Sequence, residues 1–141
     1  ANGVETHLCY LSEKQGIKYR MLDQEILADY GDGIKGKLYK RFEFNSVFRY
    51  IIKKQIDLVY IRSDHNANPF TIRLVRKIKK AGIHVVMEIP TYPYDQEYVL
   101  SKRKIQLLID KCFRKQLAKY LDRIILFQLQ NDIRNPNTPN L

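Results

Sequence analysis

The sequence lacks several features that would assign it to a common class of protein. It has only two cysteines in 141 residues, Cys9 and Cys112, which are too few for a disulfide scaffold. We therefore expect a reduced, cytosolic compartment. No signal peptide is predicted at the amino terminus. No apolar run approaches the ~20 residues that a transmembrane helix needs, so no membrane-spanning segment is predicted.

The usual fingerprints of nucleotide and metal chemistry are also missing. There is no Gly-x-Gly-x-x-Gly and no Gly-x-x-x-x-Gly-Lys segment, so no self-contained phosphate-binding loop is predicted. No serine lies in a nucleophile elbow. No set of histidines, cysteines or carboxylates has the spacing of metal ligands. We therefore expect neither a bound cofactor nor a metal.

What the sequence does have is an ordinary globular composition with an excess of positive charge. Hydrophobic residues make up 45% and charged residues 28% of the chain, and the formal net charge is +10. The length suits one domain. We expect this domain over residues 1–127, followed over 128–141 by a polar, Asn- and Pro-rich tail or linker. Both ends look cut, so the chain is expected to be a piece of a larger protein.

The pattern of apolar residues predicts an α/β fold. Two extended segments, 4–11 and 18–27, precede a turn at 30–33. Beyond residue 44, helices are predicted over 45–54, 69–81 and 101–121, and strands over 56–61, 83–89 and 123–127. Asn45 or Ser46 is expected to cap the first helix, Asn68 the second, and Gly82 to end the second. This alternation predicts right-handed crossovers and a doubly wound, Rossmann-like parallel sheet with helices on both faces.

Two polar loops follow two of the predicted strands. Because ligands bind beyond the carboxyl ends of parallel strands, both loops open onto one edge if the two strands are neighbours. The candidate substrate-binding residues are Arg62, Asp64, His65, Asn66, Glu88, Thr91, Tyr92, Tyr94 and Asp95. Of these, His65, Asp64 and Glu88 are the candidates for catalysis.

Structural roles remain open for several of these residues. Arg62 can pair with Asp64, and Glu88 can accept hydrogen bonds from backbone N–H groups of the loop that follows it. Asp95 can be a helix or turn cap. His84, which lies inside a predicted strand, is expected to be a partly buried packing residue, as is His7.

The helix predicted at 101–121 is amphipathic and basic. Its apolar stripe is expected to be Ile105, Leu108, Ile109, Cys112, Phe113, Leu117, Tyr120 and Leu121. The residues expected to meet an anionic membrane surface are Lys104, Lys111, Arg114 and Lys115. Two other interpretations stay open, namely a nucleic-acid-binding face and an ordinary solvated face over a packed core.

The segment 59–98, with the sequence EIPTYPYD at 88–95, resembles the amino-terminal domain of bacterial GT-B glycosyltransferases of the family-four type. Segment 110–127 is similar to the helix and strand that come next in that domain. The resemblance covers roughly residues 45–127. It implies an incomplete acceptor-side domain, since the family's first strand and glycine-rich turn would precede Gly3.

The resemblance also implies a function. The chain would be the acceptor-binding half of a glycosyltransferase that moves a sugar from a nucleotide-sugar to a glycan or lipid-linked acceptor, in cell-surface polysaccharide synthesis. The nucleotide-sugar is a co-substrate held by a second domain, no metal is expected, and the fragment alone is expected to be inactive. A cytoplasmic site, peripheral at the inner face of the membrane, is implied.

The alternative function is a basic nucleic-acid-binding α/β module. Ten tyrosines, six phenylalanines and the +10 charge would suit stacking and phosphate contact. However, most aromatic residues fall in predicted core stripes, and no recognised binding motif is present. Nucleic acid is therefore the less favoured partner.

Overall fold

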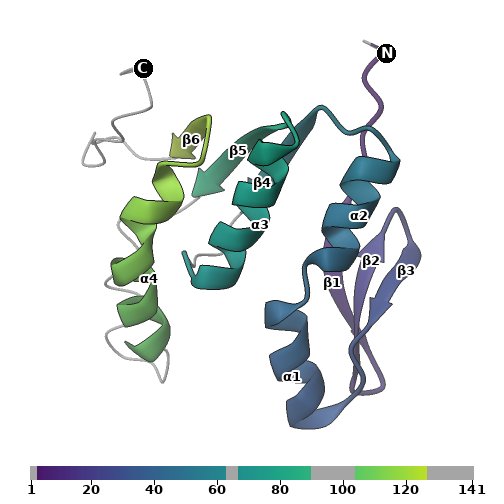
Figure 1. The fold of residues 1–141 in the computed structure, drawn as a ribbon. Helices are drawn as coiled ribbons and strands as arrows, with labels where there is room; N and C mark the ends of the chain where they lie inside the picture. The colour runs from purple at the N-terminus through teal and green to yellow at the C-terminus, as the bar shows by residue number, and fades with distance from the viewer. Residues whose placement is uncertain (1–2, 63–66, 90–103, 127–141) are drawn as a thin grey trace. The chain divides into compact units, whose positions relative to one another are not determined.

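A computed structural model describes residues 3–62, 67–89 and 104–126 (Figure 1). The chain divides into two compact units, Ala1–Ile51 and Ile52–Leu141. A single domain is predicted over 1–127 from the sequence, and the division after Ile51 differs from that expectation. The expected tail at 128–141 lies outside the described residues.

The first unit contains a three-stranded antiparallel sheet. β1 (Cys9–Lys14), β2 (Ile17–Leu22) and β3 (Glu25–Asp29) are hydrogen-bonded in that order (Figure 1). Two tight turns reverse the chain, because both turn residues between each pair of strands have positive φ, which matches the twist of a hairpin. The two extended segments of the sequence analysis are therefore three strands with different bounds, and they run antiparallel.

Helix α1 (Gly33–Phe42) was not predicted from the sequence. Asp32 occupies its N-cap position but makes no side-chain capping hydrogen bond, so the usual start signal is weak. Inside the helix, a Cβ on Gly36 would lie 2.4 Å from the carbonyl oxygen of Gly31. Only glycine fits this close approach of two backbone segments.

A buried arginine joins the sheet of the first unit to α1. Arg20 donates from Nε to the Tyr30 hydroxyl (2.7 Å) and from Nη2 to the Lys40 carbonyl (3.1 Å). Helix α2 (Asn45–Lys53) begins close by, where the Glu43 carboxylate accepts hydrogen bonds from the Ser46 N–H (2.9 Å) and the Ser46 hydroxyl (2.6 Å). Glu43 thus provides a cap that the sequence analysis expected from Asn45 or Ser46.

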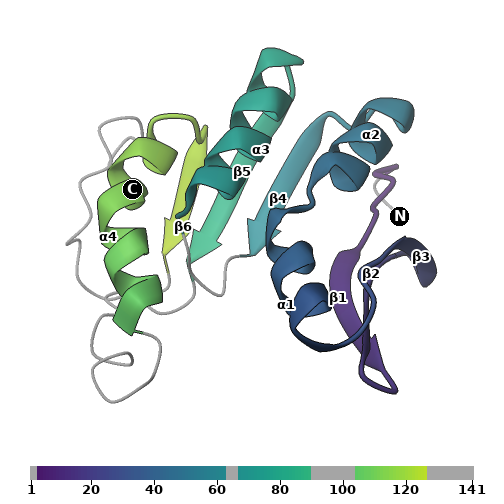
Figure 2. The same ribbon diagram turned by 60° about the horizontal axis from the view of Figure 1, so that its bottom comes forward.

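The second unit contains a parallel three-stranded sheet, in the order β4 (Leu58–Arg62), β5 (His84–Ile89), β6 (Arg123–Leu126). Along the chain, helix α3 (Pro69–Lys80) links β4 to β5, and helix α4 (Lys104–Ala118) comes after β5 and before β6 (Figures 1 and 2). The predicted α/β class and the alternation of helices and strands are confirmed here.

Both of these helices cover the same face of the parallel sheet (Figure 2). Since the strand order advances in one direction, two right-handed crossovers place their helices on one side. On that side Val85 and Met87 are fully or almost fully buried, whereas Leu58 and Tyr60 on the other face are 54% and 51% exposed. The prediction of helices on both faces is therefore wrong for the described residues of this unit, because a doubly wound sheet needs a reversal of strand order.

The predicted boundaries of α3 are confirmed by its capping geometry. The Asn68 side chain accepts hydrogen bonds from the N–H groups of Phe70 (2.9 Å) and Thr71 (3.0 Å), and Pro69 takes the first helical position. Gly82, with φ of 79°, follows the helix end in the left-handed conformation.

Asp122 fastens the start of β6 to β5. Its carboxylate accepts hydrogen bonds from the Val85 N–H (2.6 Å) and the Lys79 ammonium (2.6 Å). Partial burial acts to raise the pKa of Asp122, but these two hydrogen bonds outweigh it and hold the pKa below its ordinary value. His84, whose Nδ1 lies 3.7 Å from Asp122, is mostly exposed, so its prediction as a packing residue is wrong. His7 in the first unit is largely buried, as predicted, and is hydrogen-bonded to Asp23.

The depressed pKa of Asp122 predicts a loss of stability in acid. A carboxyl group whose pKa is lower in the folded state stabilises the fold above its unfolded pKa, near 4, and this contribution disappears as the pH falls through the folded value. We expect Asp122→Asn to lower the free energy of unfolding by about 1 kcal/mol at pH 7 and to flatten its dependence on pH below about 4. Urea unfolding across that pH range measures both effects. The exposed Asp57 provides the control: Asp57→Asn should change the free energy of unfolding at pH 7 by less than about 0.5 kcal/mol. An equal loss in both variants would contradict the role of Asp122.

Candidate functional site

The carboxyl ends of β4 and β5 lie side by side. The two strands are parallel neighbours, and their register pairs Arg62 with Glu88. The condition on which the sequence analysis relied, adjacency of the two strands, is therefore met. Both candidate loops leave the sheet from this one edge.

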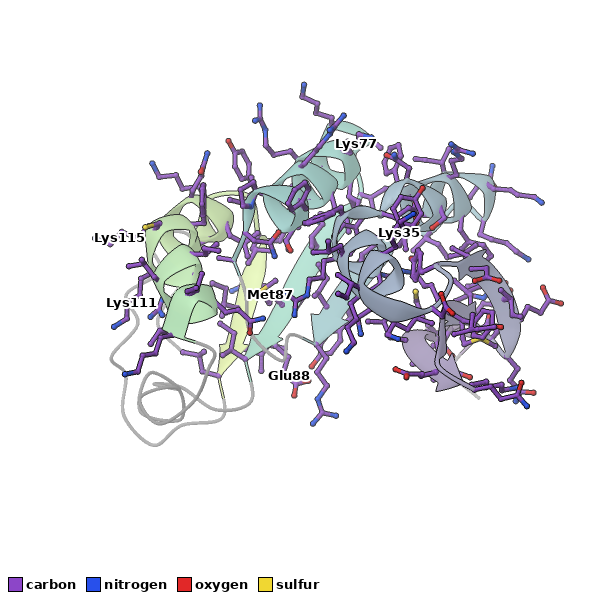
Figure 3. The ribbon with its side chains drawn as sticks, turned by 90° about the horizontal axis from the view of Figure 1, so that it is seen from below. Lys35, Lys77, Met87, Glu88, Lys111 and Lys115 are labelled. Carbon is purple, nitrogen blue, oxygen red and sulfur yellow. The ribbon has the colours of Figure 1, made fainter. Side chains whose placement is uncertain are left out.

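Glu88 is the buried polar group of this edge. It is 7% exposed, although it lies on the face of the sheet that α3 and α4 leave uncovered. Figure 3 shows Glu88 on the side of the sheet away from Lys77 of α3, while its neighbour Met87 lies toward the helices. A buried carboxylate is costly unless polar partners compensate for its lost hydration, so its contacts decide its role.

Two residues of β4 supply these partners. The Tyr60 hydroxyl donates a short hydrogen bond to Oε2 of Glu88, and Nε of Arg62 lies 3.3 Å from Oε1. The hydrogen bond to Glu88 raises the pKa of Tyr60 above its ordinary value, since the carboxylate favours the protonated phenol. Because the Arg62 side chain is 74% exposed, the ion pair contributes little to stability and leaves much of the guanidinium open to solvent.

This arrangement combines acceptor and donor groups at one edge. Glu88 offers carboxylate lone pairs, and the exposed guanidinium of Arg62 offers forked N–H donors that suit a phosphate or a carboxylate. Such a pair can orient hydroxyl groups and anionic groups of one ligand. Tyr60 was not among the candidates from the sequence, although its place two residues before Arg62 puts both side chains on the same face of β4.

The remaining candidates of the two loops lie outside the described residues. They are Asp64, His65, Asn66, Thr91, Tyr92, Tyr94 and Asp95. Their roles stay predictions, as do the pairing of Arg62 with Asp64 and the acceptance by Glu88 of N–H groups from the loop that follows it.

The residues of α4 that were predicted to meet a membrane surface fall into two groups. Lys104, Lys111 and Lys115 are exposed. Arg114 instead forms an ion pair with the buried Asp110, with distances of 2.7 Å from Nη2 and 2.9 Å from Nε to Oδ2. Its side chain is 25% exposed and pairs with Asp110, so Arg114 is less available to a surface than the three lysines, and its contact with a membrane stays a prediction.

Asp110 is a structural residue that the sequence analysis missed. It is 2% exposed, and its Oδ1 accepts a hydrogen bond from the Ala67 N–H (2.8 Å), just before α3. The same carboxylate therefore ties α4 both to its own Arg114 and to the start of α3. The available signal was an acidic residue four positions before an arginine on a helix.

The position of Asp110 also explains an error in the predicted apolar stripe. Asp110, Leu117 and Leu121 are all buried and share one side of the helix and its end, at spacings of seven and four residues. Ile105 and Leu108, which the stripe included, are 72% and 64% exposed. The first half of the predicted stripe therefore lies on the outer surface of α4.

No family model, no curated protein and no solved structure matched this chain in the comparisons. Within residues 3–62, 67–89 and 104–126, no three His, Cys, Asp or Glu side chains gather in a way that could hold a metal ion. In the same part of the chain, no helix combines the length and the apolar character needed to cross a bilayer.

The buried ion pair of α4 predicts an unequal response to two neighbouring substitutions. Arg114→Met leaves the buried Asp110 carboxylate without its guanidinium, and we expect it to lower the free energy of unfolding by about 2–3 kcal/mol. The exposed neighbour gives the control, since Lys115→Met should change this free energy by less than about 0.5 kcal/mol. The double variant Asp110→Asn/Arg114→Met should recover part of the loss, because no buried charge remains. Equal effects of Arg114→Met and Lys115→Met in urea unfolding would show that Arg114 belongs to the solvated face after all.

Proposed function

We propose that this chain is the acceptor-binding half of a glycosyltransferase of the GT-B type. The complete enzyme would transfer a sugar from a nucleotide-sugar to a glycan or lipid-linked acceptor, in the synthesis of a cell-surface polysaccharide. The proposal combines two observations. One is the resemblance of segment 59–98 to the amino-terminal domain of the family-four enzymes, and the other is the geometry at the carboxyl ends of β4 and β5, which we call the carboxyl edge.

The observation that carries the proposal is the buried carboxylate of Glu88, held at the end of the central strand by Tyr60 and Arg62. Open parallel sheets bind ligands outside the carboxyl ends of their strands. A carboxylate buried there is suited to polar recognition, because every ligand hydroxyl that donates to it replaces hydration that folding has removed.

We assign the polar groups of this edge to the acceptor. Glu88 accepts hydrogen bonds from acceptor hydroxyls, and the exposed guanidinium of Arg62 meets a phosphate, as in a lipid-linked sugar. In this proposal Asn66, Thr91, Tyr92, Tyr94 and Asp95 share the orientation of acceptor hydroxyls, the contact with the phosphate and the shaping of the acceptor site. His65 or Asp64 assists proton transfer from the acceptor hydroxyl.

The nucleotide-sugar is a co-substrate in this proposal and binds to a second domain. The chain by itself is then inactive in transfer but competent to bind the acceptor. No metal takes part, because basic side chains and helix N-termini neutralise the diphosphate. The site of action is the cytoplasmic side of the membrane. A basic nucleic-acid-binding function remains the alternative. Oligonucleotide binding that falls steeply with added salt, together with no binding of acceptor analogues, would favour that alternative.

Binding of acceptor analogues tests this proposal. Backbone NMR shifts of the chain are followed while short glycans and prenyl-diphosphate-linked sugars are added. We expect shifts concentrated at the ends of β4 and β5, and we expect Glu88→Gln to weaken binding about tenfold, since a hydrogen bond to a charged acceptor is worth about 1.5 kcal/mol. Tyr60→Phe, which frees one oxygen of the same carboxylate, should weaken it less.

The matched control is Glu13→Gln on the exposed β1 strand, which removes the same charge in the first unit and should leave binding unchanged. Circular dichroism checks that each variant is folded. The proposal fails if no acceptor analogue shifts the β4 and β5 ends, or if Glu88→Gln and the control bind equally well.

A further inference from the structure

The outer surfaces of α3 and α4 form a cationic groove, which we call the α3–α4 groove. It has a volume of about 530 Å³. Four basic residues of α3 line it at helical spacing, Arg73, Arg76, Lys77 and Lys80. Phe113 and Gln116 of α4 line the opposite side. None of the described residues that line this groove is acidic, so its electrostatic potential is positive.

One of these cations is held in place by an aromatic ring. The Arg76 guanidinium lies 5.4 Å from the centre of the Tyr120 ring, within the range of a cation–π contact. The contact fixes the direction of this guanidinium across the space between the helices. Figure 3 shows Lys77 of α3 pointing away from the sheet, and Lys111 and Lys115 of α4 on the outer surface of the same unit.

An exposed apolar ridge runs along α4 beside the groove. It consists of Ile105, Leu108, Ile109 and Cys112, which follow the spacing of one helix face. Ile105 and Leu108 are 72% and 64% exposed, and Ile109 is 39% exposed. Contiguous aliphatic side chains at this exposure mark an interaction surface.

The ridge lies between two rows of positive charge. The groove cations of α3 lie on one side, next to Phe113 and Gln116, and Lys104, Lys111 and Lys115 lie on the other side by helical periodicity. An apolar strip bordered by lysines and arginines is typical of helices that lie in the plane of a lipid interface. Aliphatic side chains enter the boundary between headgroups and acyl chains, while the flanking cations meet phosphates.

We propose that the α3–α4 groove and the apolar ridge dock onto an anionic phospholipid surface. Ile105 and Leu108 insert below the headgroups, and the four basic residues of the groove bind the phosphates of those headgroups. The surface lies on the helix-covered side of the parallel sheet, so it leaves the carboxyl edge with Glu88 open. This inference is independent of sugar transfer and would hold for any activity at that edge.

The apolar ridge favours a lipid surface over nucleic acid. Nucleic acids are bound through phosphate contacts and through aromatic or arginine stacking on bases. The exposed aliphatic side chains of the ridge, which lie between the cations, make no such contact with a nucleic acid. Transfer of each of these side chains into the acyl region of a membrane is favourable. Cations alone would suit either partner, and the ridge separates the two.

Co-sedimentation of the full chain with vesicles tests the inference. The probes are vesicles of phosphatidylglycerol mixed with phosphatidylcholine, and vesicles of phosphatidylcholine alone. We expect sedimentation with the anionic vesicles only. Arg73→Gln/Lys80→Gln should weaken partition about thirtyfold, from about 1 kcal/mol for each basic residue near the surface. Ile105→Gln/Leu108→Gln, which keeps every charge, should also weaken partition at least tenfold.

The control is Lys14→Gln/Lys53→Gln, which removes two exposed charges outside this surface and should change partition less than threefold. An equal loss in this control would mean that net charge alone drives binding and would overturn the inference. So would normal partition of Ile105→Gln/Leu108→Gln. Tight, salt-dependent binding of oligonucleotides that is lost in Arg73→Gln/Lys80→Gln, without vesicle binding, would assign the groove to nucleic acid.

Two further measurements distinguish membrane docking from self-association of the chain and from acceptor binding. Sedimentation equilibrium without vesicles should show a monomer, and self-association that Ile105→Gln/Leu108→Gln abolishes would mean that the ridge joins two copies of this chain. Glu88→Gln should leave partition unchanged. A failure of acceptor binding with intact partition would thus count against the sugar-transfer proposal alone.

Discussion

The parallel pairing of β4 with β5 is the constraint on which the rest of the second unit depends. Its register sets Arg62 opposite Glu88 and so places three polar side chains, including Tyr60, at one edge of the sheet. The same pairing requires a crossover through α3, whose right-handed path fixes the covered face of the sheet. If the register between β4 and β5 slipped by one residue, the side chain of Glu88 would face the side of the sheet on which Val85 and Met87 lie, against the helices. Its charge would then lose Tyr60 and Arg62 as partners.

The single direction of the strand order gives this unit two different surfaces. The helices gather on one side, where they bury Val85 and Met87 and present a basic outer layer. The carboxyl edge carries the one buried carboxylate of the described β-strands of this unit, at Glu88. The two surfaces suit different ligands. The outer layer of the helices offers many exposed cations around aliphatic side chains, whereas the carboxyl edge offers a few convergent hydrogen-bonding groups. Recognition of a polar acceptor and attachment to an anionic surface are compatible because the two surfaces are separate.

Local signals in the sequence were sufficient for some elements and not for others. Asn68 and Gly82 predicted the ends of α3 because capping and left-handed conformations depend on a few adjacent residues. Helix α1 escaped prediction because Asp32 makes no capping bond and Gly36 is required only by its approach to Gly31, which no local pattern reveals.

The faces of α4 were misassigned for a similar reason. Ile105 and Leu108 have the spacing of a core stripe, but the burial of Asp110 and its bond to Ala67 turn another side of the helix inward. At the carboxyl edge, adjacency of the strands was predictable from the alternation of elements, whereas the partners of Glu88 depend on register.

The central claim is that Glu88 is retained at the edge for recognition and contributes little to the stability of the fold. Urea unfolding of Glu88→Met tests this claim most directly, because the substitution keeps the volume of the side chain and removes the buried charge. Tyr60 is a half-exposed residue, so the hydroxyl that loses its partner can turn to water. We predict that the free energy of unfolding of Glu88→Met lies within about 1 kcal/mol of that of the original chain, or above it, as is common when an apolar side chain replaces a buried charge. A loss of about 3 kcal/mol or more would show that the carboxylate holds the sheet together and would contradict the claim.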